Sequence, residues 1–148
     1  MLAPPANVAA VLTYNGSATP PTEVGSYFVV ATSGDPNYSG STNGVLVVTQ
    51  ATSTVTILGA TPLNAPAGQP VTVRYLVTSV GTPTGNVTIF SASGEQCTAT
   101  VAAGECALTF NESSTRVLAA SYNGDKNHQS SMSTNFDYGD LIFSDGFE

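Results

Sequence analysis

The 148-residue chain contains an internal repeat, and this repeat constrains its fold more than any other feature. Residues 25–42 and residues 115–132 align without gaps at an offset of 90 residues. Each copy is an apolar run, then a turn with the pattern G-D-x-N, then a Ser-rich start of another strand. This pattern indicates one β-hairpin that occurs twice. The offset is typical of the size of a small β-sandwich domain.

The second copy lies within residues 51–139, which we predict to form a complete all-β domain. In the segment 71–77, apolar and polar side chains alternate as in a strand with one buried face. Six other segments have similar patterns and are separated by turn residues. About seven short strands at this spacing favour an immunoglobulin-like antiparallel β-sandwich. The predicted strands are about 53–57, 71–77, 86–90, 97–101, 106–110, 116–122 and about 132–138.

The first copy lies within residues 1–49, where only three strands are visible, at 11–15, 26–32 and 44–48. Three strands make roughly half of a sandwich, so their apolar face lacks an opposing sheet. We interpret this segment as the C-terminal half of a preceding module, truncated at Met1. Two alternatives stay open: the three strands add to the second domain, or they are loosely ordered. We predict that residues 140–148 form an acidic surface tail.

Charge excludes several classes of partner. The formal net charge is −7, and only Arg74, Arg116 and Lys126 carry fixed positive charge. Binding to nucleic acid or to an anionic membrane surface needs many more basic residues. No apolar run is long enough to span a membrane, and the start of the chain lacks the features of a signal peptide. The scarcity of Lys and the abundance of Ser, Thr and Asn favour an exported protein whose secretion signal lies upstream.

The sequence offers no catalytic constellation. Its single histidine, His128, lies in the repeated turn, where the first copy has Tyr38. A general base there would need a nucleophile and an orienting carboxylate nearby, and the adjacent Ser130 and Ser131 do not make a triad. We expect His128 to be an exposed turn residue. We therefore predict that the chain is not an enzyme and needs no cofactor.

The two G-D-x-N turns bring Asp35 near Asn37 and Asp125 near Asn127. Side chains of these types accept backbone N–H hydrogen bonds inside turns, which favours a structural role. Calcium binding is the alternative, but one carboxylate and one amide fall short of the six to eight oxygens that calcium prefers. No Cys/His cluster is present for zinc, so we predict no metal site.

The two cysteines, Cys97 and Cys106, lie on consecutive predicted strands. We predict a disulfide between them in an exported protein, and two free thiols in a reducing compartment are the alternative. If Ala102 and Ala103 form a two-residue hairpin loop, both sulfurs lie diagonally on one face, at the edge of bridging distance. A register slip of one residue places the sulfurs on opposite faces and forbids the bond.

Residues 51–139 resemble the bacterial Ig-like repeat domains that occur in tandem in large secreted and surface proteins. The resemblance rests on four pieces: AGQPVTV (67–73), GTPTGNVTIF (81–90), the CTATV/CALTF pair and LAASYNGDKNHQSS (118–131). Together they cover much of the domain. His128 departs from the family pattern, which usually has an aromatic or apolar residue there.

Residues 9–49 resemble the end of an MBG-type module from the same kind of protein. The matching pieces are TYNGSATPPTEVGSY (13–27) and DPNYSGSTNGVLVV (35–48). The final residues resemble the short DGFE-type tails of exported proteins from Gram-negative bacteria. The resemblance implies that the first half of the MBG-type module is missing.

These resemblances imply a non-catalytic structural or adhesive repeat segment, acting as a spacer or stalk, that is exported from a Gram-negative bacterium to its surface or surroundings. The expected partners are neighbouring Ig-like repeats in a parent chain, and we expect neither nucleic-acid binding nor membrane insertion. A second hypothesis is a module that binds a glycan or a surface protein through loops at one end of the sandwich. A contiguous patch of exposed aromatic side chains would favour that second hypothesis.

Overall fold

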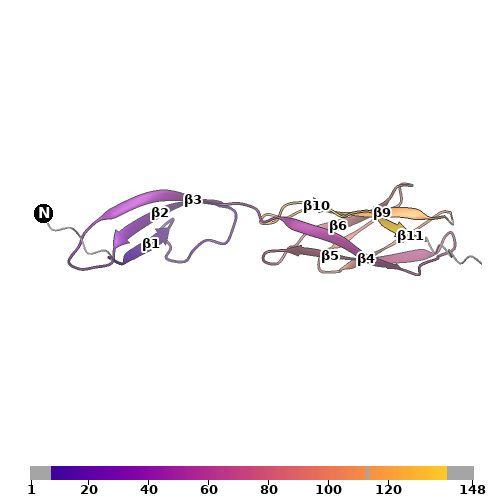
Figure 1. The fold of residues 1–148 in the computed structure, drawn as a ribbon, viewed down its shortest axis with the longest axis horizontal. Helices are drawn as coiled ribbons and strands as arrows, with labels where there is room; N and C mark the ends of the chain where they lie inside the picture. Colours follow the sequence, from indigo (N-terminus) through magenta and orange to yellow (C-terminus); the bar gives the residue numbers. More distant parts are fainter. Residues whose placement is uncertain (1–7, 113, 140–148) are drawn as a thin grey trace, which may run out of the picture. The chain divides into compact units, whose positions relative to one another are not determined.

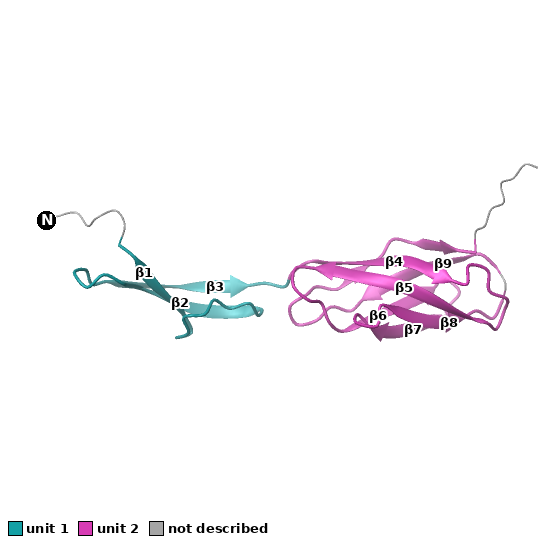
Figure 2. Cartoon of the chain, turned by 90° about the horizontal axis from the view of Figure 1, so that it is seen from below, with its two compact units in different colours: residues 1–50 teal, residues 51–148 magenta. Residues whose placement is uncertain are grey.

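A computed structural model describes residues 8–112 and 114–139. These residues contain no helix, and their strands form three antiparallel sheets. The chain divides into two compact units, residues 1–50 and residues 51–148, which we call unit 1 and unit 2 (Figure 2). The predicted surface tail at 140–148 lies outside the described residues.

Unit 1 is a single sheet in the order β1-β2-β3 (Figure 1). The strands are β1 (Ala10–Tyr14), β2 (Gly25–Ser33) and β3 (Ser41–Val48). One face is rich in apolar side chains from all three strands, including Leu12, Val29 and Leu46. No second layer of described residues covers this face, and none of residues 8–50 is buried. The described residues of unit 1 therefore form no hydrophobic core of their own.

Unit 2 is a two-layer sandwich, which confirms the predicted immunoglobulin-like fold (Figure 2). One layer, in the order β4-β5-β8, contains β4 (Ser53–Thr61), β5 (Pro70–Ser79) and β8 (Glu105–Thr109). The other, in the order β10-β9-β6-β7, contains β6 (Asn86–Ser91), β7 (Gln96–Thr100), β9 (Arg116–Tyr122) and β10 (Ser131–Met132). A further strand, β11 (Phe136–Tyr138), also pairs with β9. We call these the β5 layer and the β9 layer.

The core of unit 2 lies between the two layers and follows from the alternation in the sequence. On β5, the residues Val71, Val73, Tyr75 and Val77 are all buried, and their neighbours on the strand are not. The β9 layer contributes residues that are fully buried, including Ile89 and Leu118. Burial of apolar side chains from both layers is the main stabilising term for a sandwich of this kind. The remaining core residues are Val55, Ile57, Ala60, Val87, Cys106, Leu108, Phe110, Ala120, Tyr122 and Tyr138.

Two predictions about the strands were wrong. The segments around Cys97 and Cys106 do not form a hairpin, because β7 pairs with β6 in the β9 layer and β8 pairs with β5 in the other layer. The predicted strand at 132–138 is divided into β10 and β11. Between them the pairing with β9 shifts by one residue, as in a β-bulge, and the Ala120 N–H donates to the Ser133 hydroxyl (2.9 Å).

The chain enters and leaves unit 2 at opposite ends of the sandwich. At the start of β4, the Ser53 hydroxyl donates to the Gln129 carbonyl (2.6 Å), just before β10. At the other end of β4, the Pro62 carbonyl accepts a hydrogen bond from the Tyr138 hydroxyl (2.7 Å), the last residue of β11. The first and last strands therefore run alongside each other for the length of the domain.

Candidate functional site

A disulfide joins Cys97 on β7 to Cys106 on β8, which confirms the predicted bond but not its predicted setting. The two Cα atoms are 6.0 Å apart, within the usual range for a disulfide. Because the two strands belong to different layers, neither of the hairpin registers considered above applies. The bond crosses the edge of the sandwich and links the β9 layer to the β5 layer.

Beside the disulfide, one hydrogen bond joins the two layers, and a second holds the turn between β7 and β8 against β5. The Tyr75 hydroxyl on β5 donates to the Thr100 carbonyl at the end of β7 (2.6 Å). The Tyr75 amide donates to the carbonyl of Gly104, in the turn between β7 and β8 (2.9 Å). Burial raises the pKa of Tyr75, and the nearby Glu105 carboxylate raises it further, so the hydroxyl keeps its proton. The contacts at this edge are therefore structural: they hold the two layers of the sandwich together beside the disulfide.

In unit 1 the repeated turn makes one hydrogen bond to a distant segment, from the Gly34 N–H to the Ala9 carbonyl (2.8 Å), and its Asp and Asn make local ones. The Asp35 carboxylate accepts the Asn37 N–H (2.8 Å), and the Tyr38 N–H donates to the Asp35 carbonyl (3.2 Å). The Tyr38 side chain is exposed. This arrangement is an ordinary Asx-type turn.

In unit 2 the same turn makes longer-range contacts through Asp125. One carboxylate oxygen accepts the amide and the hydroxyl of Thr84, from the loop between β5 and β6 (both 2.8 Å). The other oxygen accepts the amides of Asn127 and His128 (both 2.8 Å). Gly124 is needed beside it, because its φ is +79° and a Cβ would lie 2.8 Å from the His128 carbonyl oxygen. Asp125 thus fastens two loops to each other.

His128 is buried, so the prediction of an exposed turn histidine was wrong. Its exposed fraction is 6%, because the loop between β5 and β6 packs over it. The Nδ1 atom lies 2.7 Å from an Asp125 carboxylate oxygen, and Nε2 lies 2.9 Å from the Val80 carbonyl oxygen. Both neighbours are acceptors, and only the doubly protonated ring can donate to both.

This geometry stabilises the charged forms of both residues. The hydrogen bond to Val80 raises the pKa of His128; burial opposes this, and the Asp125 carboxylate adds to it. For Asp125, burial acts to raise the pKa, but hydrogen bonds from Thr84, Asn127 and His128 hold it far below its usual range. A histidine with both ring nitrogens engaged has no lone pair for a substrate. We therefore assign a structural role to His128 and Asp125, which hold their turn against the loop between β5 and β6.

The same turn also holds the first residue of unit 2. The Ala51 N–H donates to the Asn127 carbonyl (2.8 Å), and the Gln129 N–H donates to the Ala51 carbonyl (2.9 Å). Ala51 therefore forms a parallel bridge with His128, immediately before β4 begins. The sequence signal for this contact is weak. The repeated G-D-x-N pattern predicts the turn, but it does not predict that the turn binds Ala51.

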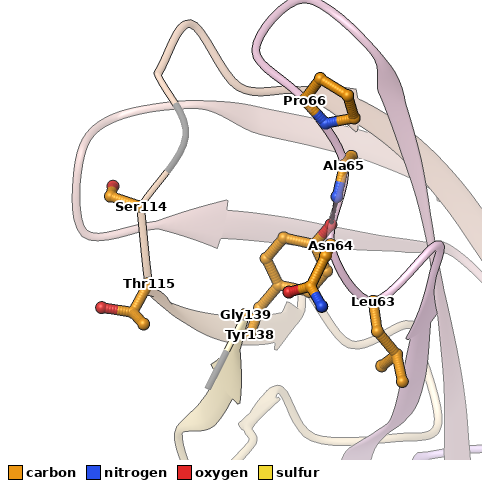
Figure 3. A pocket seen from close by; sticks show the side chains of 8 residues that line it. All are labelled: Leu63, Asn64, Ala65, Pro66, Ser114, Thr115, Tyr138 and Gly139. Atoms are coloured by element: carbon orange, nitrogen blue, oxygen red, sulfur yellow. Dashed lines mark hydrogen bonds between the residues drawn. The ribbon is translucent and has the colours of Figure 1, made fainter. Parts of the chain in front are cut away.

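A hollow of about 390 Å³ lies at the other end of unit 2. Figure 3 shows residues 63–66 on one side of it, Ser114 and Thr115 on the other, and Tyr138 between them. The Tyr138 hydroxyl is engaged, since it accepts the Ala65 N–H (3.0 Å) and donates to the Pro62 carbonyl. None of the described residues that line the hollow has a carboxylate, imidazole or thiol side chain.

Over the described ranges, no group of three His, Cys, Asp or Glu side chains is placed to hold a metal ion. The turn pairs Asp35/Asn37 and Asp125/Asn127 use a carboxylate oxygen for backbone hydrogen bonds. Within the same ranges there is no helix long and apolar enough to cross a membrane.

Comparison with known families follows the division into two units. Residues 58–138, more than half of the chain, match the family model of the bacterial Ig-like domain (group 3). The chain belongs to the bacterial Ig-like domain family. Residues 2–52 match the model of the MBG domain. Both matches confirm the resemblances found in the sequence. No curated protein and no solved structure matches this bacterial Ig-like chain.

Bacterial Ig-like domains are typically non-catalytic, and neither matching family indicates an enzyme. Together the two families suggest a structural repeat of a surface protein. A disulfide in such a domain is typical of extracellular or surface proteins.

Proposed function

We propose that this bacterial Ig-like chain is a non-catalytic spacer or stalk segment of an exported protein. The observation that carries the proposal is the path of the chain through unit 2, which enters at one end of the sandwich and leaves at the other. A domain with this path adds its full length to a chain of repeats. Neighbouring Ig-like repeats of a parent chain are its proposed partners.

The chemistry of unit 2 supports the same role. A disulfide closes one edge of the sandwich, and such bonds persist in oxidising compartments outside the cytosol. The His128 turn holds the first residue of the unit, so the sandwich is anchored where the chain arrives. These features favour a domain that stays folded when its two ends are pulled.

Unit 1 is interpreted as the C-terminal half of an MBG-type module. Its match to the MBG family supports the module type, and its uncovered apolar face supports the view that further residues pack on it. In this view, the face that includes Leu12 and Val29 is where the rest of the module packs.

The aromatic residues support a spacer rather than a sugar-binding module. In the described part of unit 2, all aromatic side chains are buried or half-buried, so its loops offer no exposed stacking platform. These residues are Tyr75, Phe90, Phe110, Tyr122, Phe136 and Tyr138.

Single-molecule stretching of the whole chain from its two ends tests the proposal. We expect unit 2 to unfold in one step at a measurable force. The reduced chain should gain roughly 25 Å more length than the oxidised chain, because nine residue steps of about 3.4 Å replace the 6.0 Å between the Cα atoms of the two cysteines. A chain that extends gradually without a barrier would contradict the spacer role. Binding of the same protein to a glycan array through unit 2 would favour the alternative.

A further inference from the structure

The outer edge of β3 in unit 1 is an unpaired strand edge. β3 pairs with β2, and no described strand lies on its other side. The Ser33 N–H donates to the Gly40 carbonyl (2.9 Å), which sets the alternation of hydrogen bonds along this antiparallel pair. The backbone N–H and C=O groups of Ser41, Asn43, Val45 and Val47 therefore point away from β2. Eight residues of continuous strand carry this open row.

The equivalent edge in unit 2 is protected: the start of β4 lies beside it, and its strand also differs from β3 in sequence and shape. The offset of 90 residues places β3 opposite 131–138. There the strand is broken into β10 and β11 by the bulge at Ser133, and it carries the charged residue Asp137. Short strands, bulges and charges are the devices by which proteins prevent pairing between sheet edges. β3 has none of them.

The side chains of β3 also favour pairing. Val45 and Val47 are 68% and 60% exposed. The strand STNGVLVV contains no charged residue and no proline. Elsewhere in the described part of unit 1, only Glu23 and Asp35 are charged. A long, uncharged strand rich in valine has high β-propensity and low repulsion.

We propose that this edge binds β3 of a second copy of the chain, antiparallel and across a two-fold axis. An uncharged strand is compatible with itself, and a two-fold axis allows each chain to exchange the same hydrogen bonds with its partner. An axis at Val45 places the two Val45 side chains opposite each other and pairs Asn43 with Val47 of the partner. The two sheets then form one continuous six-stranded sheet. This surface lies beyond the spacer role and does not depend on it.

Sedimentation velocity of the whole oxidised chain over a range of concentrations tests the association directly. We expect a monomer–dimer equilibrium, and the amides of Val45 and Val47 should become protected from hydrogen exchange as the dimer forms. A monomer at every concentration up to the solubility limit would overturn the proposal. So would a dimer in which these two amides exchange as fast as in the monomer.

A proline substitution separates edge pairing from packing of the sheet faces. Val45→Pro removes one outward N–H per chain and leaves the bonds to β2 in place, since prolines are tolerated on strand edges. Two lost hydrogen bonds per dimer should raise the dissociation constant about 30-fold. Val45→Ala keeps the N–H and should weaken the dimer far less. Leu12→Pro, which removes an outward N–H on the opposite edge of the sheet, should leave the dimer intact.

A charge-swap pair serves as a test that does not rely on proline. Val45→Glu should abolish the dimer, because two like charges would face each other across the axis. Val45→Lys should do the same. An equimolar mixture of the two variants should form a heterodimer of one chain of each. If the mixture stays monomeric while the unsubstituted chain dimerises, the axis at Val45 is wrong and the proposal fails.

Discussion

At the scale of single residues, His128 shows how a turn residue becomes structural. It is the only histidine in the chain, and both of its ring nitrogens face acceptors. Other charged or titratable groups near this turn are Asp125, Lys126 and Tyr122. A protonated His128 ring therefore strengthens the contact between its own turn, which holds Ala51, and the loop that contains Val80.

Stability should depend on pH through His128. Its folded-state pKa is raised above the ordinary 6.5, so the extra stability is fully present below pH 6.5 and is lost as the pH rises through the folded-state value. We expect the free energy of unfolding of unit 2 to decrease as the pH rises above about 6.5. Urea titrations at several pH values measure this change. His128→Gln should flatten the profile in this window, and an unchanged slope in that variant would contradict the assignment.

Tyr75 gives a second residue-scale prediction. Tyr75→Phe keeps the buried ring but removes the hydrogen bond from its hydroxyl to Thr100 on the other layer. We expect a loss of about 1 kcal/mol in the stability of unit 2, measured by urea unfolding. Tyr27→Phe is the matched control, because the Tyr27 hydroxyl donates to Glu23 within unit 1. If both variants left unit 2 unchanged, the hydroxyl of Tyr75 would not contribute to joining the layers.

At the scale of elements, the disulfide determines how β7 and β8 are held together. The two strands lie in different layers and share no ladder of hydrogen bonds, so the disulfide replaces the pairing that a hairpin would have. It closes a loop of only ten residues, which limits the entropy it removes from the unfolded chain.

The double variant Cys97→Ala/Cys106→Ala should lose about 2–3 kcal/mol of stability relative to the oxidised protein. Chemical denaturation of the oxidised chain and of the variant measures the difference. The reduced unsubstituted chain is the control and should behave like the variant. Detection of two reactive thiols in the native, unreduced protein would contradict the bond itself.

The strands themselves could be predicted from the sequence, but their partners could not. Alternation identified the buried face of β5 from Val71 to Val77, because period 2 is a local property. The connection between β7 and β8 is equally short whether the chain turns back in one sheet or crosses to the other. That choice depends on contacts with β5, such as the bond from Tyr75 to Gly104, which lie far away in sequence. His128 was misjudged for the same reason, since the loop that buries it is more than forty residues away.

At the scale of the whole molecule, the two units differ in how they are stabilised. Unit 2 has a core between two layers, whereas no described residue of unit 1 is buried. A sheet with an apolar face is stabilised mainly by packing that face against another layer, and no layer of described residues covers the sheet of unit 1. Backbone amides that exchange only through cooperative unfolding should therefore be confined to unit 2.

Hydrogen exchange measured on dilute protein tests this contrast. We expect the amides of β1, β2 and β3 to exchange far faster than those of β5, β6 and β9, because only the latter open through unfolding of a core. Dilution keeps any association through β3 from adding protection. Equal protection in both units would show that unit 1 is stabilised by contacts beyond its own sheet.

The path of the chain through unit 2 has a consequence for how a larger protein could change in size. Since the chain arrives at one end of the sandwich and departs from the other, each additional domain of this kind would contribute a similar increment of reach. Duplication or deletion of one repeat would then alter how far a terminal region extends, without any redesign of an interface inside the domain. Length would be adjusted by copy number alone.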